Sequence, residues 1–103
     1  MAAPHPESNE AVSERLRLLR KALDFDTSSA FAAHLGVSPQ RWNNVENNVP
    51  LGRDLALTLV QKHPGLTLDW LYRGKTEGLP LALARLLGAL EGSGITKTTP
   101  RPR

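Results

Sequence analysis

A stop signal for one helix and a start signal for another stand almost side by side at Gly36 and Ser38-Pro39. Glycine adopts the left-handed conformation in which many helices end, because it has no Cβ atom to clash. A serine hydroxyl caps the first turn of a helix, and a proline directly after it loses nothing by lacking an N–H group. The sequence therefore predicts two helices, at about residues 28–35 and 39–47, joined by a tight turn.

Apolar residues also recur at helical spacing in four further segments, and no segment shows the alternation typical of a strand. Leucine and alanine, which favour helix, supply most of the apolar residues. The further predicted helices cover about residues 12–23, 52–63, 68–73 and 79–91. We therefore expect an all-α fold. A compact domain of five to six helices would occupy residues 11–92, between a flexible N-terminal segment (1–10) and a disordered basic tail (93–103).

The charge of the chain neither requires nor excludes a nucleic-acid partner. The formal net charge is +3, and Lys97, Arg101 and Arg103 in the tail account for that excess. Clustered basic residues, not bulk charge, give affinity for phosphates. The chain contains no cysteine, no secretory signal and no apolar run of the roughly 20 residues that span a bilayer. We expect a cytoplasmic protein that does not enter a membrane.

The predicted helix at 39–47 has two distinct faces. At about 100° per residue, Trp42 and Val45 define an inward face. The opposite side carries the polar residues Gln40, Asn43, Asn44 and Asn47, with Arg41 on a flank. Asparagine and glutamine amides can pair with adenine and a guanidinium with guanine, so this face suits the edges of bases. The alternative is an ordinary polar surface with capping asparagines.

Several residues recur in an order and spacing that point to a known family. They are Phe31-Ala32, Leu35-Gly36-Val37-Ser38, Trp42, Val45-Glu46-Asn47 and Pro50, then Leu68-Asp69-Trp70-Leu71-Tyr72-Arg73-Gly74. Together they resemble the Cro/C1-type (XRE-like) helix-turn-helix family, the lambda-repressor-like domains of phages and bacteria. The resemblance covers about residues 12–75. It implies a lambda-repressor-like fold whose second motif helix enters the major groove of DNA.

The resemblance also assigns roles to residues. It places base reading on Pro39, Gln40 and Asn44, although Pro39 has no donor to offer. The residues expected to contact DNA are Thr27, Ser28, Gln40, Arg41, Asn43, Asn44 and Asn47, the first two at the DNA backbone. The structural residues of the motif are expected to be Ala32, Gly36, Trp42, Val45 and Glu46. Glu46 would pair with a basic residue of the first helix, either Arg20 or Lys21.

Two functions compete on the sequence alone. The first is a bacterial or phage transcriptional regulator that binds double-stranded DNA and represses by occupying an operator. The second is a protein-interaction module of the same fold, such as an antitoxin that neutralises a partner protein. A basic stripe from Arg41, Arg53 and the start of helix 28–35 would favour the first, and an exposed apolar patch the second. The segment 79–91 carries more leucines than a five-helix core needs, namely Leu83, Leu86, Leu87 and Leu90. We predict that part of this leucine stripe forms a homodimer interface.

Enzyme chemistry finds no support in the sequence. His5, His34 and His63 are scattered along the chain, which predicts no metal site. No segment resembles a nucleophile turn or a glycine-rich phosphate loop. We therefore expect a protein without catalytic residues, cofactor or metal.

Overall fold

Short hydroxyl side chains begin four of the helices. In a computed structural model, which describes residues 5 and 7–95, Ser8, Thr27, Ser38 and Thr67 each accept a hydrogen bond from a backbone N–H of the following turn. Such a bond satisfies one of the N–H groups that a helix start leaves without an intrahelical partner. The helices are α1 (Asn9–Ala22), α2 (Ser28–Leu35), α3 (Pro39–Val45), α4 (Arg53–Lys62), α5 (Leu68–Arg73) and α6 (Leu81–Ile95).

Left-handed glycines end α2 and α5, and left-handed residues also follow α1 and α3 within three residues. Gly36 follows α2 with φ 79°, Gly74 follows α5 with φ 74°, and Asn48 lies just beyond α3 with φ 73°. Asparagine is one of the few residues other than glycine that adopt this conformation readily. Six helices and no strand occupy the described residues, which confirms the all-α prediction for that part of the chain.

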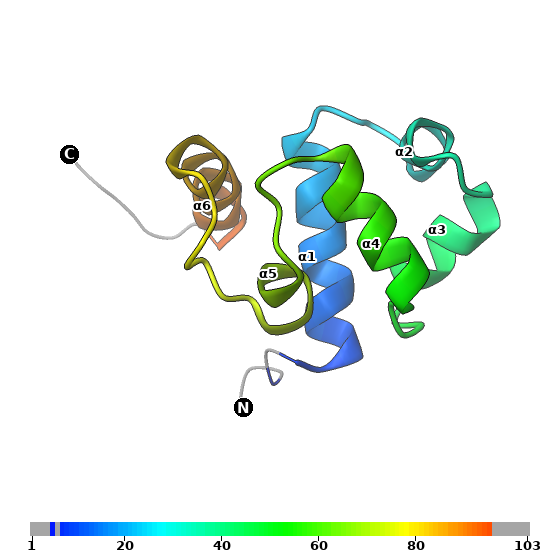
Figure 1. The fold of residues 1–103 in the computed structure, drawn as a ribbon, viewed down its shortest axis with the longest axis horizontal. Helices are drawn as coiled ribbons and strands as arrows, with labels where there is room; N and C mark the ends of the chain where they lie inside the picture. Colours follow the sequence, from blue (N-terminus) through cyan, green and yellow to red (C-terminus); the bar gives the residue numbers. More distant parts are fainter. Residues whose placement is uncertain (1–4, 6, 96–103) are drawn as a thin grey trace.

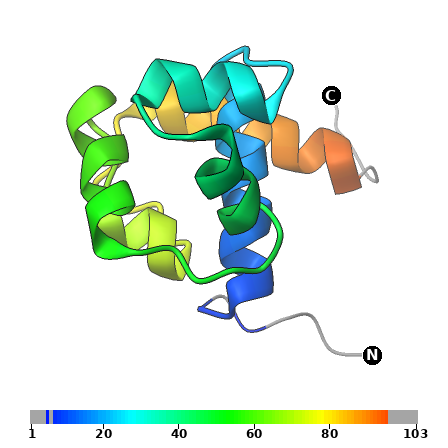
Figure 2. The same cartoon turned by 90° about the vertical axis from the view of Figure 1, so that its right-hand side faces the viewer.

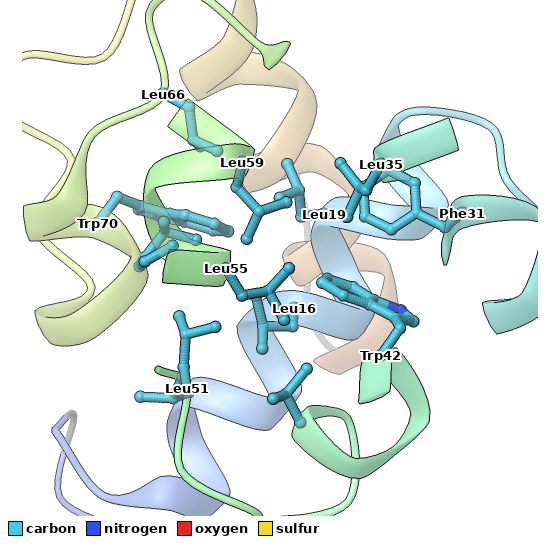
Figure 3. Close-up of a cluster of buried hydrophobic side chains, with 14 of the residues drawn as sticks. Leu16, Leu19, Phe31, Leu35, Trp42, Leu51, Leu55, Leu59, Leu66 and Trp70 are labelled. Carbon is cyan, nitrogen blue, oxygen red and sulfur yellow. The ribbon is translucent and has the colours of Figure 1, made fainter. Parts of the chain in front are cut away.

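The core is built around α1 and α4. Leu16 and Leu19 of α1 and Leu55 and Leu59 of α4 are essentially inaccessible to solvent. Figure 3 shows their side chains meeting those of the neighbouring helices, including both tryptophans. The other buried apolar residues labelled there are Phe31, Leu35, Trp42, Leu51, Leu66 and Trp70. Burying such side chains is the main favourable term in folding.

The α2–α3 pair and α6 lie at opposite ends of the molecule (Figure 1). Figure 2 looks onto the α2–α3 end, where α3 stands in front of α1 and α4 lies to one side. The opposite end is formed by α6, which packs against α1. The two ends therefore present separate surfaces.

The structure corrects three predicted boundaries. α1 begins at Asn9, inside the segment predicted to be flexible, because Ser8 caps it. α3 ends at Val45, before Asn47. α6 continues through Gly92 to Ile95 and so enters the predicted tail, since a glycine inside a helix costs only about 1 kcal/mol. Residues 96–103 of that tail lie outside the described residues.

The leucines of α6 do not share one role. Leu87 is buried and Leu83 packs against the core, whereas Leu86 is 43% exposed. The side chain of Leu90 lies outside the part of the chain whose side chains are described. Two of the four leucines complete the core of the single chain, so only part of the leucine stripe is left for a second copy.

Candidate nucleic-acid interface

The turn between α2 and α3 is closed by backbone hydrogen bonds. The N–H of Val37 donates to the carbonyl of Ala32 at 3.0 Å, and that of Gly36 donates to Ala33 at 3.2 Å. Ala32 is fully buried, so its small side chain allows α2 close contact with its neighbours. Across the turn, the rings of Phe31 and Trp42 meet edge to face with centroids 4.8 Å apart. The two helices therefore form one rigid unit over residues 28–45.

α3 presents the two faces that its sequence predicts. Trp42 and Val45 are buried. Four of the five predicted reading residues are exposed, and Asn44 is half-buried. The exposed residues are Gln40, Arg41, Asn43 and Asn47.

The amide side chains of this face pair along the helix. The Nε2 group of Gln40 donates to Oδ1 of Asn44 at 2.8 Å. The Nδ2 group of Asn47 donates to the backbone carbonyl of Asn43 at 2.7 Å. The first pair uses one donor of Gln40 and one lone pair of Asn44, which leaves the Nδ2 donors of Asn44 and the carbonyl of Gln40 available. Asn47 acts in part as a cap for the end of α3.

The carboxylate of Glu46 is buried just after α3 and collects donors from three elements. Arg20 of α1 donates through Nε to Oε2 at 2.7 Å, and the two side chains are 9% and 5% exposed. The Ser28 hydroxyl at the start of α2 donates to Oε1 at 3.0 Å. The indole N–H of Trp42 donates to Oε2. We call these four residues the Glu46 cluster; it ties α3 to both α1 and α2.

Arg20 extends this network into the loop between α1 and α2. Its Nη1 group donates to the carbonyls of Phe25 at 3.0 Å and Asp26 at 2.9 Å. Of the two basic residues that the family resemblance offers as partners for Glu46, Arg20 makes the contact, while Lys21 is exposed. The guanidinium therefore holds the loop, the start of α2 and the end of α3 in one arrangement.

Ser13 is a structural residue that the sequence analysis missed. It is fully buried on α1, where its hydroxyl donates to the carbonyl of Val45 at 2.6 Å and accepts from the N–H of Asn48 at 2.9 Å. These bonds satisfy backbone groups that the end of α3 leaves without partners. In the sequence, only its position beside the apolar face of α1 points to Ser13. A serine exposed to solvent would occupy the same kind of position.

The two residues predicted to meet the DNA backbone differ in their surroundings. Thr27 is exposed, and its oxygen caps α2 by accepting from the N–H of Ala30 at 3.1 Å. Ser28 is half-buried and its hydroxyl proton points to Glu46. A phosphate accepts hydrogen bonds, so the Ser28 hydroxyl cannot donate to one while it serves Glu46.

Two of the three scattered histidines lie together in the structure. The Nε2 atoms of His34 and His63 are 3.3 Å apart, on the outer side of Phe31. Burial lowers the pKa of His63, and the neighbouring His34 and Lys62 lower it further. The sequence does not predict this pair, because the two positions are far apart in the chain and only the packing of α2 beside α4 brings them together.

Comparisons with protein-family models, with curated proteins and with solved structures each give no match to this chain. Over residues 5 and 7–95, no helix is long and apolar enough to cross a membrane. The function of this chain is therefore inferred from its own residues and their geometry.

Neutralising Glu46 should destabilise the fold strongly. Glu46→Gln keeps the shape of the side chain but leaves the buried Arg20 without its counter-charge, for which we expect a loss of about 3–5 kcal/mol in the free energy of unfolding. Urea denaturation followed by circular dichroism measures it. Glu7→Gln is the matched control, because its ion pair with Arg73 is half-exposed and should contribute less than about 1 kcal/mol. Equal losses in the two variants would contradict the assignment.

His63 should make stability fall on mild acidification. The folded chain protonates His63 at a lower pH than the unfolded chain, whose pKa is near 6.5. From about pH 7 downward through that window the unfolded state binds more protons, so the free energy of unfolding decreases. The melting temperature of the parent should therefore drop more between pH 7.5 and 5.5 than that of His63→Asn. His5→Asn should keep the parental drop, and an unchanged drop in His63→Asn would refute the prediction.

Proposed function

We propose that this chain is a transcriptional regulator that binds double-stranded DNA, acting as a repressor with α3 in the major groove. The observation that carries the proposal is the outward face of α3, where amides and one guanidinium are presented by a helix that the Glu46 cluster holds in place. An α-helix fits the width of the major groove. The family resemblance of residues 12–75 supports the same function and a lambda-repressor-like fold. Such a regulator would act in the cytoplasm, without a cofactor or catalytic residues.

The chemistry of the face favours bases over a general polar contact. Gln40 and Asn44 orient each other through their hydrogen bond, which lowers the entropy that they lose on binding. Their remaining donors and acceptor match the N7 and N6 groups of adenine. Arg41 is exposed and can reach guanine or a phosphate.

Contacts to phosphates would come from the flanks of α3. Thr27 stands exposed at the start of α2, where the backbone N–H groups of the first turn attract anions. Arg53 is exposed at the start of α4. Asn43 and Asn47 complete the surface that would face the DNA. The Asn47 amide already donates to the backbone carbonyl of Asn43, so only its remaining donor and its oxygen would be available to the DNA.

The exposed leucines favour a second candidate function, that of a protein-interaction module such as an antitoxin. Leu81 and Leu86 of α6 are 66% and 43% exposed, at the end of the molecule opposite α3. A protein partner that packs on α6 would cover these exposed side chains. A second copy of the chain on α6 would instead fit the regulator, since a homodimer doubles the number of DNA contacts.

DNA binding should be sensitive to salt. Each phosphate contact releases condensed counterions, so two or more contacts imply an affinity loss of at least about tenfold between 50 and 200 mM salt. Fluorescence anisotropy with a random duplex and with a site selected from a random library measures this loss. No binding to either duplex at 50 mM salt would refute the regulator and leave the interaction module.

Asn44→Ala should relax the preference for the selected site. If Asn44 reads a base, the variant loses about 1–3 kcal/mol on the selected duplex and little on random DNA. Asn9→Ala is the matched control, because Asn9 is exposed at the start of α1. An equal loss on both duplexes would assign Asn44 to the DNA backbone instead.

The chain should form homodimers through α6. Leu86→Glu places a charge on the exposed part of that helix, where it would be desolvated in a dimer. Sedimentation at tens of micromolar should give a dimeric mass for the parent and a monomeric mass for the variant. A monomeric parent would contradict the dimer but would leave DNA binding by a single copy.

A further inference from the structure

The contact between His34 and His63 has the geometry of two ligands on one metal ion. His34 belongs to the last turn of α2, and His63 directly follows α4. Their Nε2 atoms are 3.3 Å apart and their ring centroids 5.2 Å apart. The nitrogens therefore face each other, with the rings extending away on either side.

The contact is a long hydrogen bond, and its spacing also matches that of two nitrogens on one metal ion. Protein N–H hydrogen bonds have lengths of about 2.7–3.2 Å, with the most frequent value near 2.9–3.0 Å. A tetrahedral ion with metal–nitrogen bonds of about 2.0–2.1 Å holds two ligand nitrogens about 3.3–3.4 Å apart. The same arrangement places two imidazole centroids about 5.2 Å apart when both rings point at the ion. Both distances in the structure agree with the two-ligand geometry.

The surrounding aromatic rings orient the two imidazoles in advance. The ring of Phe25 lies 4.9 Å from that of His34, and the ring of Phe31 lies 5.9 Å from His34 and 6.2 Å from His63. Phe31 itself is fully buried, so its ring is packed among other core side chains. A ligand pair that is already oriented loses little entropy when an ion binds.

We propose that His34 and His63 bind a divalent transition-metal ion of the kind that prefers imidazole, such as Zn²⁺. The ion would lie beside the contact, within bonding distance of both Nε2 atoms, and would join α2 to α4. No group of three or more potential ligands occurs among the residues that the structure describes, so water would fill the other coordination positions. Lys62 lies close enough to His63 to repel a cation. The site is therefore weaker than a closed structural zinc site.

Zinc chloride titrated into the full chain at pH 7.5, without DNA, tests the site. The imidazole proton signals in NMR spectra should shift for His34 and His63 and stay in place for His5. His34→Asn and His63→Asn should each weaken the affinity at least about tenfold, since loss of a ligand costs no less than loss of its supporting partner. His5→Asn is the matched control and should bind as the parent does.

A second measurement separates binding from folding. Because the ion would bind only where α2 and α4 pack together, zinc should raise the melting temperature of the parent and not that of the two variants. Circular dichroism shows whether each variant retains its helices. One ion per two chains, lost in the same variants, also supports the site, since a second copy would then provide the other two ligands.

Two results would overturn the proposal. One is the absence of saturable binding up to millimolar zinc. The other is binding of equal affinity in the parent and in both His34→Asn and His63→Asn. Neither outcome bears on DNA binding, because α3 contributes no ligand to the site.

Discussion

The buried ion pair between Arg20 and Glu46 is the interaction on which the arrangement of the α2–α3 unit depends. Removing two charges from water costs several kcal/mol per ion, so the pair is tolerated only where further hydrogen bonds satisfy it. The Ser28 hydroxyl and the indole of Trp42 supply them on the carboxylate side, and two loop carbonyls supply them on the guanidinium side. Since these partners come from α1, α2, α3 and the α1–α2 loop, any shift of α3 would leave a buried charge uncompensated.

This constraint accounts for the contrast between the two faces of α3. A helix of seven residues is too short to be stable alone, so its orientation comes from tertiary contacts. Trp42 contributes both to the core and to the Glu46 cluster. Ser13 satisfies the backbone at the end of the same helix. Because these contacts hold the inner face of α3, the amide side chains on its outer face need no contacts with the core. Their hydrogen-bonding groups therefore remain available for a ligand.

The proposed metal site would act on the same unit from its other side. The Glu46 cluster joins the start of α2 to α1 and α3, whereas the histidine pair joins the end of α2 to α4. An ion between His34 and His63 would therefore stiffen α2 without contacting the outer face of α3. The exposed leucines of α6 lie at the far end of the molecule, so DNA, an ion and a second copy could each occupy a different surface.

Local chemistry in the sequence determined the helices and the faces of α3. Ser38-Pro39, Gly36 and the spacing of Trp42 and Val45 act within one or two turns, so they can be interpreted without knowing the fold. Only the tertiary structure decided which residues meet across the chain. The choice of Arg20 over Lys21, the burial of Ser13 and the contact of His34 with His63 depend on how helices distant in sequence pack. Periodicity places each side chain around its own helix axis, but it carries no information about the neighbouring helix that the side chain will face.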